Sequence, residues 1–452
     1  MDRIARADAP RGPLKILLWH GYLLGGTGSN VYTRSLARCW SGLGHEVIVF
    51  CQDPDPRQFD LGTARVVRPE IGGILPVFVL DRYRDLEPRL LQDLTPAQRD
   101  DFVEANASEL KRQLPADLVF ANHALLGAPV GAAVGAPYAV KVHGSELEFS
   151  MRGNPELCRW ANQTLSGAAT VFTGSEHIRG ALREIVGPGA YTSRIHVVPP
   201  GVDVDLFRPQ TREDAFRALL AEARRDPPHP SGAPDVERLP DPGNAVRFER
   251  FLRGEGATIV YFGKLSKEKG VHLLIQALDR CPARTVIVGF GEARAELELA
   301  AHAIAPGRVL FTGALEHRHL VNLLPLADIT VVPSLFPEAF GMVAAEAASA
   351  GSIPLVAHHS GLAEIADGLE AEYPDGYGDL TRFRRGDAGD LSDRLQAILA
   401  LRPEQQRQLR VAARRAAVRR WSWERVSAAL LEALGFAGGE LSSEEDPTRA
   451  GG

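Results

Sequence analysis

One pattern, repeated along most of this chain, constrains its fold more than any other feature. A short apolar run is followed by a loop that contains glycine and then by a stretch of helical length. Runs of this kind are typical of parallel strands joined by crossover helices, so the sequence predicts an α/β protein. The runs expected to form strands lie at residues 15–20, 46–50, 117–121, 138–142, 169–173 and 195–198, and then at 258–262, 285–288, 309–311, 329–332 and 353–356.

The pattern is interrupted once, which predicts two doubly wound, Rossmann-like domains. The chain has 452 residues, a length that also favours two domains. We expect residues 14–205 to form the first domain and residues 257–420 to form the second. Residues 206–256 are expected to be a linker or an insertion, because residues 226–244 are rich in proline, glycine and charge and cannot hold a regular element for long.

The last part of the chain is predicted to be helical. Residues 388–420 carry amphipathic patterns, and residues 421–436 begin with Trp421 and Trp423 and continue as an apolar helix. Residues 437–452 have the composition of a disordered tail. Within the second domain, helices are expected at residues 269–280, 292–304, 318–325 and 340–350.

Composition excludes several classes of function. The net charge is -6, which gives no overall attraction to nucleic acid, although locally basic faces stay possible. Its four cysteines are widely spread, which argues against a disulfide framework and a structural zinc site. Residues 1–21 lack the apolar stretch of a secretion signal, and no run is long enough to span a membrane. We therefore expect a soluble, cytoplasmic protein.

The segment 338–346 (EAFGMVAAE) is the first candidate for a binding site. It follows the strand expected at residues 329–332, and ligands of open α/β sheets bind at the carboxyl ends of strands. A helix expected to begin near Phe340 would offer free N–H groups to a diphosphate. Glu346 would then lie in a nearly all-apolar helix, where a carboxylate is costly without a partner. The alternative is that Glu338 offsets the helix dipole and Glu346 is exposed.

The segment 263–270 (GKLSKEKG) is the second candidate. Only six lysines occur in the chain, and three of them lie at 264–269. Lys264 and Lys269 follow an expected strand and could neutralise the charge of a leaving diphosphate. The alternative is a solvated basic turn.

Weaker signals follow other expected strands. Gly25 and Gly26 could let the backbone approach a phosphate or a sugar, or could form a tight strand–helix turn. His143 could contact a substrate hydroxyl or assist proton movement, or could be structural. Gly289 and the Ser360–Gly361 pair could belong to the same site or could be turns.

These motifs, in this order, resemble those of the retaining family 4 glycosyltransferases with the GT-B fold. Residues 338–346 resemble the family's E-x7-E motif, and residues 263–270 resemble its G-R-x-x-x-E-K-G segment, with Lys264 in place of arginine. Residues 197–203 (VVPPGVD) resemble the P-N-G-V-D that ends the first domain, with Pro200 in place of asparagine. The likeness covers roughly residues 14–435 and implies two domains facing a cleft, with C-terminal helices that cross back to the first domain.

The resemblance also implies roles for single residues. The second domain would bind a nucleoside-diphosphate sugar without a metal, and the first would bind most of a hydroxyl acceptor, which could be a glycan, a lipid-linked molecule or a small molecule. Glu338, His143 and Lys269 would be catalytic, with Glu338 on donor-sugar hydroxyls. Glu346 would bind the ribose. The donor-binding residues implied are Gly26, Lys264, Lys269, Gly289, Ser334, Phe340, Gly341, Met342 and Glu346.

The sequence departs from the family pattern at two positions, and other functions are still possible alternatives at this point. Lys264 keeps the charge of arginine but loses its bidentate fork, and Ser360–Gly361 stands where the family often has two glycines. A sugar-nucleotide sensor or scaffold, an epimerase and a phosphorylase are the alternatives.

Contact with a membrane is a further alternative. A basic stretch at residues 407–420 could make a weak peripheral contact with anionic lipid at the inner face of the membrane, although a solvated helix face is the more usual explanation. The arginines concerned are Arg407, Arg410, Arg414, Arg415, Arg419 and Arg420.

Overall fold

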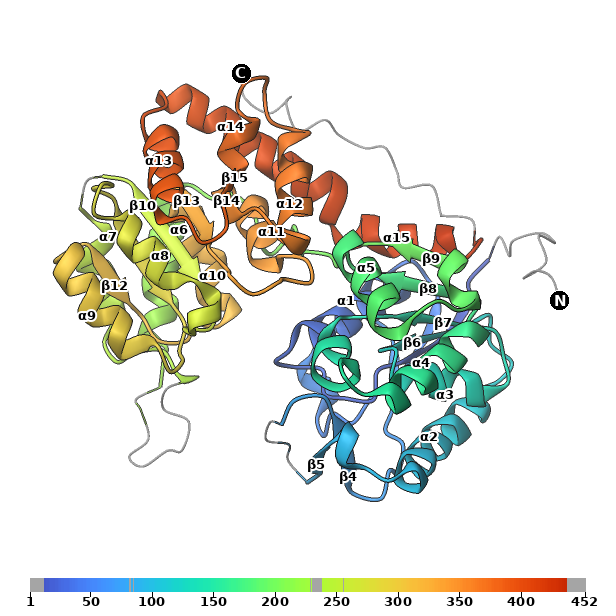
Figure 1. The fold of residues 1–452 in the computed structure, drawn as a ribbon. Coiled ribbons are helices and arrows are strands. Elements are labelled where there is room, and N and C mark those ends of the chain that lie inside the picture. The colour runs from blue at the N-terminus through green and yellow to red at the C-terminus, as the bar shows by residue number, and fades with distance from the viewer. Residues whose placement is uncertain are drawn as a thin grey trace. The chain divides into compact units, whose positions relative to one another are not determined.

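The computed structural model describes residues 12–80, 83, 85–227, 229, 238–254 and 256–436. The chain divides into two compact units. The first contains the residues up to Gly174, then Ile178–Pro199 and the chain from Trp423 onward; the second contains Ser175–His177 and Pro200–Ser422. The elements of each unit can be followed in Figure 1. The tail expected at residues 437–452 lies outside the described residues.

The first unit is built on a seven-stranded parallel sheet in the order β3-β2-β1-β6-β7-β8-β9. Leu17 of β1, an inner strand, pairs with Ile48 on one side and with Val119 on the other. The strand order changes direction between β1 and β6, and ligands of doubly wound sheets bind at such a switch point. The strands are β1 (Lys15–Trp19), β2 (Glu46–Phe50), β3 (Arg65–Val67), β6 (Leu118–Asn122), β7 (Tyr138–Lys141), β8 (Thr170–Thr173) and β9 (Ile195–Val197).

Helices cover both faces of this sheet. Alternate residues of β1 enter different cores, with Leu17 and Trp19 in one and Ile16 and Leu18 in the other. Trp423 of the last helix joins the second of these cores and is 2% exposed. The helices are α1 (Gly28–Gly42), α2 (Pro96–Lys111), α3 (Gly127–Val134), α4 (Pro155–Gly167), α5 (Glu176–Val186) and α15 (Trp423–Ala433), and a small separate sheet pairs β4 (Ile74–Val77) with β5 (Glu87–Leu90).

The second unit is built on a six-stranded parallel sheet in the order β12-β11-β10-β13-β14-β15. Val260 pairs with Val286 and with Thr330, so the winding reverses between β10 and β13. The two sheets confirm the predicted α/β class. The strands are β10 (Thr258–Phe262), β11 (Arg284–Val288), β12 (Val309–Phe311), β13 (Ile329–Val332), β14 (Ile353–Ala357) and β15 (Arg382–Phe383).

Residues 206–256 differ from the linker or insertion that the sequence suggested. They contribute two helices to the core of the second unit, where Leu219 and Phe248 are fully buried. The first of these helices begins at a Thr211 cap, whose hydroxyl accepts from the Asp214 N–H. The helices of the unit are α6 (Arg212–Arg224), α7 (Asn244–Leu252), α8 (Val271–Ala277), α9 (Arg294–Ile304), α10 (His317–Leu323), α11 (Met342–Ser349), α12 (Ser360–Glu370), α13 (Ala388–Leu399) and α14 (Pro403–Ala416).

Several side chains of the arginine-rich stretch 407–420 bind other groups of the second unit, to which the stretch belongs. Nη2 of Arg410 lies 2.5 Å from the Asp328 carboxylate. Nη1 of Arg414 lies within hydrogen-bond distance of the carbonyl oxygens of Val204, Phe207 and Ser349. Three further arginines surround the carboxylate of Glu372, namely Arg415, Arg419 and Arg420. Much of the positive charge is therefore matched within the unit, and no described helix is long and apolar enough to cross a membrane.

Candidate functional site

Two loops at neighbouring strand ends of the second unit are joined through their backbones. The loop after β10 contains Lys264 and Lys269, and the loop after β13 runs from Pro333 to Gly341. The carbonyl oxygen of Glu268 accepts from the N–H groups of Leu335 at 2.7 Å and Phe336 at 3.0 Å. A Cβ at residue 270 would overlap the Pro333 carbonyl, so the close approach of the loops requires Gly270.

This junction brings together two of the predicted catalytic residues. Nζ of Lys269 lies 2.5 Å from Oε1 of Glu338, and the two side chains are 32% and 23% exposed. The pair is therefore shielded in part but is still reachable by a ligand. Lys264 is exposed on the same loop, where its carbonyl oxygen accepts from the Tyr261 hydroxyl at 2.8 Å.

The backbone of Glu338 is held by the turn that begins α12. Its N–H donates to Oγ of Ser360 at 2.9 Å, and its carbonyl oxygen accepts from the Gly361 N–H at 3.0 Å. A Cβ at residue 361 would meet the backbone of Ala339 and Phe340, so glycine is required there. The Ser360–Gly361 pair thus fixes the position of a predicted catalytic carboxylate.

His359 extends this hydrogen-bond network, and the donor and acceptor roles of its two ring nitrogens can be assigned. Its Nε2 lies 2.7 Å from the Ser334 carbonyl oxygen, which can only accept, so Nε2 donates. Burial, helped by Arg385 and opposed by the Ser334 carbonyl, lowers the pKa of His359. The neutral ring accepts at Nδ1, and the Ser360 hydroxyl, 3.1 Å away, donates to it. The hydroxyl of Ser334, expected to bind the donor, donates instead to the Phe336 carbonyl at 3.0 Å.

The helix after this loop begins later than the sequence suggested. It starts at Met342 rather than near Phe340, because Gly341 has a φ of 119° and cannot be part of a right-handed helix. Phe340 therefore belongs to the loop, and its ring packs edge-on against Trp421 with centroids 6.0 Å apart. The Phe340 side chain is a packing group, whereas Gly341 and Met342 lie at the open start of α11.

Glu346 lies in the second turn of α11. Its side chain is 13% exposed, and Oε1 lies 3.8 Å from Nε2 of His317, the first residue of α10. That distance is too long for a hydrogen bond, and no group within the described part of the chain donates a hydrogen bond to the carboxylate. A ligand hydroxyl could satisfy it. His317 was not predicted as a site residue, although it lies in the loop region after an expected strand as the other site residues do.

Gly289 has a packing role in the same region. Its φ is 141°, and a Cβ there would overlap the Gly263 carbonyl oxygen. The residue therefore lets the loops after β10 and β11 touch. The predicted donor-binding and catalytic residues that the second unit gathers in one network are Lys269, Glu338 and Ser334, linked through Ser360 and His359.

In the first unit, Gly26 and His143 follow different strands. Gly26 has a φ of 94°, and open space surrounds the position of a Cβ. His143 follows β7, is partly exposed, and has its Nε2 2.8 Å from Oδ1 of Asn122. Burial lowers the pKa of His143 well below the usual value, and the neighbouring His123, Lys141 and His20 lower it further.

Two more histidines lie beside His143 at strand ends. His20 follows β1 and His123 follows β6, and the rings of His123 and His143 have centroids 4.8 Å apart. Burial, together with His123, lowers the pKa of His20 to about 3. Sequence reasoning missed both residues, although they stand at the ends of apolar runs as His143 does.

Glu146 fixes the backbone of this histidine cluster. It is fully buried, and its carboxylate accepts from the N–H groups of Ala124, His143 and Gly144 at 3.1–3.2 Å. Burial raises its pKa, but His123 and these backbone donors outweigh burial, so the pKa of Glu146 is lowered. The ionised carboxylate therefore ties the end of β6 to the end of β7.

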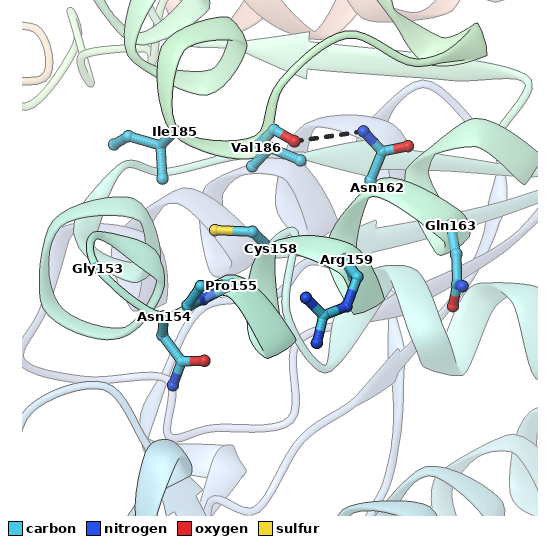
Figure 2. A pocket seen from close by; sticks show the side chains of 9 residues that line it. All are labelled: Gly153, Asn154, Pro155, Cys158, Arg159, Asn162, Gln163, Ile185 and Val186. Atoms are coloured by element: carbon cyan, nitrogen blue, oxygen red, sulfur yellow. Dashed lines mark hydrogen bonds between the residues drawn. The ribbon is translucent and has the colours of Figure 1, made fainter.

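A separate hollow of about 490 Å³ lies on the first unit (Figure 2). Asn162 donates across it to the Val186 carbonyl at 3.3 Å. The hollow contains none of the predicted site residues. Its lining consists of Gly153, Asn154, Pro155, Cys158, Arg159, Asn162, Gln163, Ile185 and Val186.

Comparisons with known sequences agree with the motifs. Residues 244–416 match the family described as glycosyl transferases group 1, and residues 27–201 match the glycosyl transferase 4-like domain. A D-inositol 3-phosphate glycosyltransferase of Xylanimonas cellulosilytica is 34% identical over 253 residues, which are 54% of this chain and 52% of that protein. The protein of the same name from Mycobacterium tuberculosis is 30% identical over 274 residues, 58% of this chain and 48% of that protein. The chain thus spans about half the length of the curated relatives it matches.

Solved structures share the fold over nearly the whole chain. Sucrose-phosphate synthase from Thermosynechococcus elongatus has a TM-score of 0.64 and 21% identity, covering 93% of this chain and 98% of the other. HepE from Anabaena, solved in complex with UDP and glucose, has a TM-score of 0.65 and 18% identity, covering 94% and 100%. At these identities the likeness establishes the fold alone.

Proposed function

Because the chain belongs to the family 4 glycosyltransferases with the GT-B fold, we propose that it moves a sugar from a nucleoside-diphosphate sugar to a hydroxyl acceptor and retains the configuration of the anomeric carbon. The observation that carries the proposal is the Lys269–Glu338 pair, with 2.5 Å between Nζ and Oε1, at the carboxyl ends of β10 and β13. It joins a cation for the diphosphate to a carboxylate for the sugar at the point where the winding of the sheet reverses.

Charge stabilisation is the proposed role of the two lysines. When the bond between the sugar and the diphosphate breaks, negative charge accumulates on the leaving phosphate oxygens. Lys269 and Lys264 and the open N–H groups at the start of α11 would stabilise that charge. These groups do what a divalent cation does in other transferases, so we propose that turnover needs no metal.

Carboxylates would bind the hydroxyl groups of the donor. Glu338 is held by backbone hydrogen bonds at both its N–H and its carbonyl oxygen, which limits its movement. We assign it to hydroxyls of the transferred sugar. Glu346, 13% exposed and only 3.8 Å from His317, is assigned to the ribose. In the first unit, His143 and Gly26 are assigned to contacts with the substrates.

The acceptor is proposed to be a polyol or another hydroxyl compound. The relatives named above act, by their names, on D-inositol 3-phosphate, and a compound of that kind is the first acceptor to try. UDP-sugars are the first donors to try, because HepE was solved with UDP and glucose. The protein is proposed to act in the cytoplasm, and contact with the membrane surface is the weaker proposal because Glu372 and Asp328 already match several arginines.

A ligand-binding screen followed by an assay tests the proposal. UDP-, GDP-, ADP- and TDP-sugars are added with EDTA, and the midpoint of thermal unfolding is measured. A donor at a hundredfold its Kd stabilises the folded protein by about 2.7 kcal/mol, so one class should raise the midpoint. That donor is then incubated with hydroxyl acceptors, and the anomeric configuration of the product is determined by NMR. Binding of a donor without transfer or hydrolysis would indicate a sugar-nucleotide sensor and not an enzyme. Activity that depends on inorganic phosphate would indicate a phosphorylase.

A further inference from the structure

Asn122, the last residue of β6, is fully buried between β1 and the histidine cluster. Its Nδ2 donates to the Trp19 carbonyl oxygen at 3.1 Å and to Oγ1 of Thr33 at 3.3 Å. The Thr33 hydroxyl in turn gives its proton to the Ser29 carbonyl at 2.9 Å. The oxygen of Thr33 is therefore an acceptor, and both N–H bonds of the Asn122 amide are used.

This network fixes which way the Asn122 amide faces. If the amide were rotated by half a turn, its oxygen would face the Trp19 carbonyl, and neither atom carries a proton. Oδ1 of Asn122 must therefore face the other way, toward Nε2 of His143 at 2.8 Å. An amide oxygen can only accept, so Nε2 of His143 carries a hydrogen.

The second ring nitrogen of His143 then has a defined state. Burial and the neighbouring His123, Lys141 and His20 hold the pKa of His143 well below the usual value, so the ring is neutral. A neutral imidazole with a hydrogen on Nε2 has a lone pair on Nδ1. Among the described residues no donor forms a hydrogen bond with that atom, and His143 is partly exposed. Nδ1 is thus the atom that a substrate can approach.

We propose that Asn122 is a positioning residue that holds His143 in the Nε2–H tautomer, so that Nδ1 accepts a hydrogen bond from a substrate hydroxyl. The inference rests on the proposed function for the identity of the substrate, but the tautomer itself does not. It assigns His143 a binding role as an acceptor and excludes it as a proton donor to the leaving group. A hydroxyl is accepted at this position, whereas a deoxy or fluoro analogue has no proton to donate.

The tautomer is measured directly by NMR. The full chain is labelled with ¹⁵N-histidine, long-range ¹H–¹⁵N correlations are recorded at pH 7, and the His143 signals are identified by their loss in His143→Gln. We expect the wild-type ring to be neutral with the hydrogen on Nε2. In Asn122→Leu the acceptor is lost, and the two tautomers should both be populated. In Asn122→Asp the carboxylate should raise the pKa of His143 and favour the doubly protonated ring.

Kinetics connect the tautomer to the substrate. The kcat/KM of Asn122→Leu should fall about 10- to 100-fold, which corresponds to the loss of one well-formed hydrogen bond to a substrate. Hydrolysis of the donor without an acceptor is measured beside transfer. If hydrolysis and transfer fall equally, the hydroxyl that His143 binds belongs to the donor. If only transfer falls, that hydroxyl belongs to the acceptor.

Asn106→Leu is the matched control. Asn106 is also fully buried in the first unit, and its Oδ1 accepts from the Trp19 indole Nε1 at 2.9 Å. Its Nδ2 donates to the Phe102 carbonyl oxygen and not to His143. Its variant should lose stability yet keep the wild-type tautomer. A hydrogen on Nδ1 of wild-type His143 would overturn the proposal even if no variant folds, as would an unchanged tautomer in Asn122→Leu. Absence of transfer with every donor, with the tautomer as expected, would instead count against the proposed function.

Discussion

Lys269 and Glu338 are 69 residues apart in the chain, and their side chains meet with 2.5 Å between Nζ and Oε1. Each follows a different strand, and the two strands flank the point where the second sheet reverses its winding. The lysine proposed to bind the diphosphate is therefore paired with the carboxylate proposed to bind the sugar. A donor that binds Lys269 through its phosphates would release Glu338 to bind sugar hydroxyls.

The first prediction concerns this pair. Glu338→Gln keeps the shape of the side chain and removes its charge. We expect kcat/KM for transfer to fall at least about 100-fold, because a charged hydrogen bond to the reacting sugar is lost, as measured by product formation. The free energy of unfolding should change by less than about 1 kcal/mol, since both side chains are partly exposed.

Asp393→Asn is the matched control for that prediction. It breaks the exposed ion pair with Arg280, whose Nη2 lies 2.8 Å from Oδ1. Transfer should be unchanged in this variant. Full activity in Glu338→Gln would remove Glu338 from the mechanism.

A second prediction concerns Ser360, which holds the Glu338 N–H with its hydroxyl and has a φ of 48°. Ser360→Ala loses the acceptor and keeps the unfavourable φ, so it should cost about 1–3 kcal/mol of unfolding free energy. Ser360→Gly loses the same acceptor but relaxes the backbone, so it should be the more stable of the two. Denaturant unfolding measures the difference. Equal stability of both variants would show that φ is not strained there.

Kinetic assays of the same two variants separate stability from positioning. Both lack the group that fixes Glu338, so kcat/KM should fall in both by a similar factor. If only Ser360→Ala lost activity, the effect would come from the backbone and not from the hydrogen bond.

The third prediction concerns Arg414, whose Nη1 is close to the carbonyl oxygens of Val204, Phe207 and Ser349. Arg414→Met removes this shared donor, although the Phe207 oxygen keeps the Ser349 hydroxyl, and it should lower the free energy of unfolding by about 2–4 kcal/mol. Arg407→Met, at a side chain that is 70% exposed, should change it by no more than about 0.5 kcal/mol. Urea unfolding followed by fluorescence compares them. A small effect in both would mean that water replaces the guanidinium.

The fourth prediction is a loss of stability in acid. The pKa of His20 is about 3 in the folded protein, against 6.5 for an ordinary histidine, so between these values the unfolded chain binds the extra proton. Stability must therefore fall as the pH drops below about 6.5. At pH 4 the difference of about 2.5 units corresponds to about 3 kcal/mol at most. The lowered pKa of Glu146 adds to the loss at still lower pH.

Urea midpoints between pH 7 and pH 4 measure this effect. His20→Gln removes the titrating ring, so its midpoint should depend less on pH than that of the wild type. His302→Gln, at an exposed position of α9, should keep the wild-type dependence. A slope that His20→Gln leaves unchanged would assign the acid sensitivity to other groups.

The strands of both sheets could be predicted from the sequence because buried parallel strands are continuous apolar runs. The runs at 46–50, 258–262 and 329–332 have the same limits as β2, β10 and β13. In contrast, β15 has two residues, too few to give an apolar run. Helices α6 and α7 escaped notice because the proline-rich stretch between them dominates the local composition.

The site was predicted as separate residues and not as a network. Lys269 and Glu338 each follow a predicted strand, but their contact depends on the bond between Glu268 and the loop at Leu335, which no local pattern encodes. The start of α11 was misplaced because the backbone of Gly341 has a positive φ, which the apolar pattern of the segment does not encode. His20 and His123 obey the strand-end rule that selected His143, so a stricter use of that rule would have found them.

The helix α15 completes the core of the first unit with Trp423 and Leu430, beside Ile16 and Leu36. A ribosome must therefore synthesise the whole second unit before the first can bury these surfaces. Until then, the nascent first unit exposes an apolar face, which is a binding site for chaperones and a risk for aggregation. The second unit does not depend on a later segment of the chain in this way, because its core residues all precede Trp423.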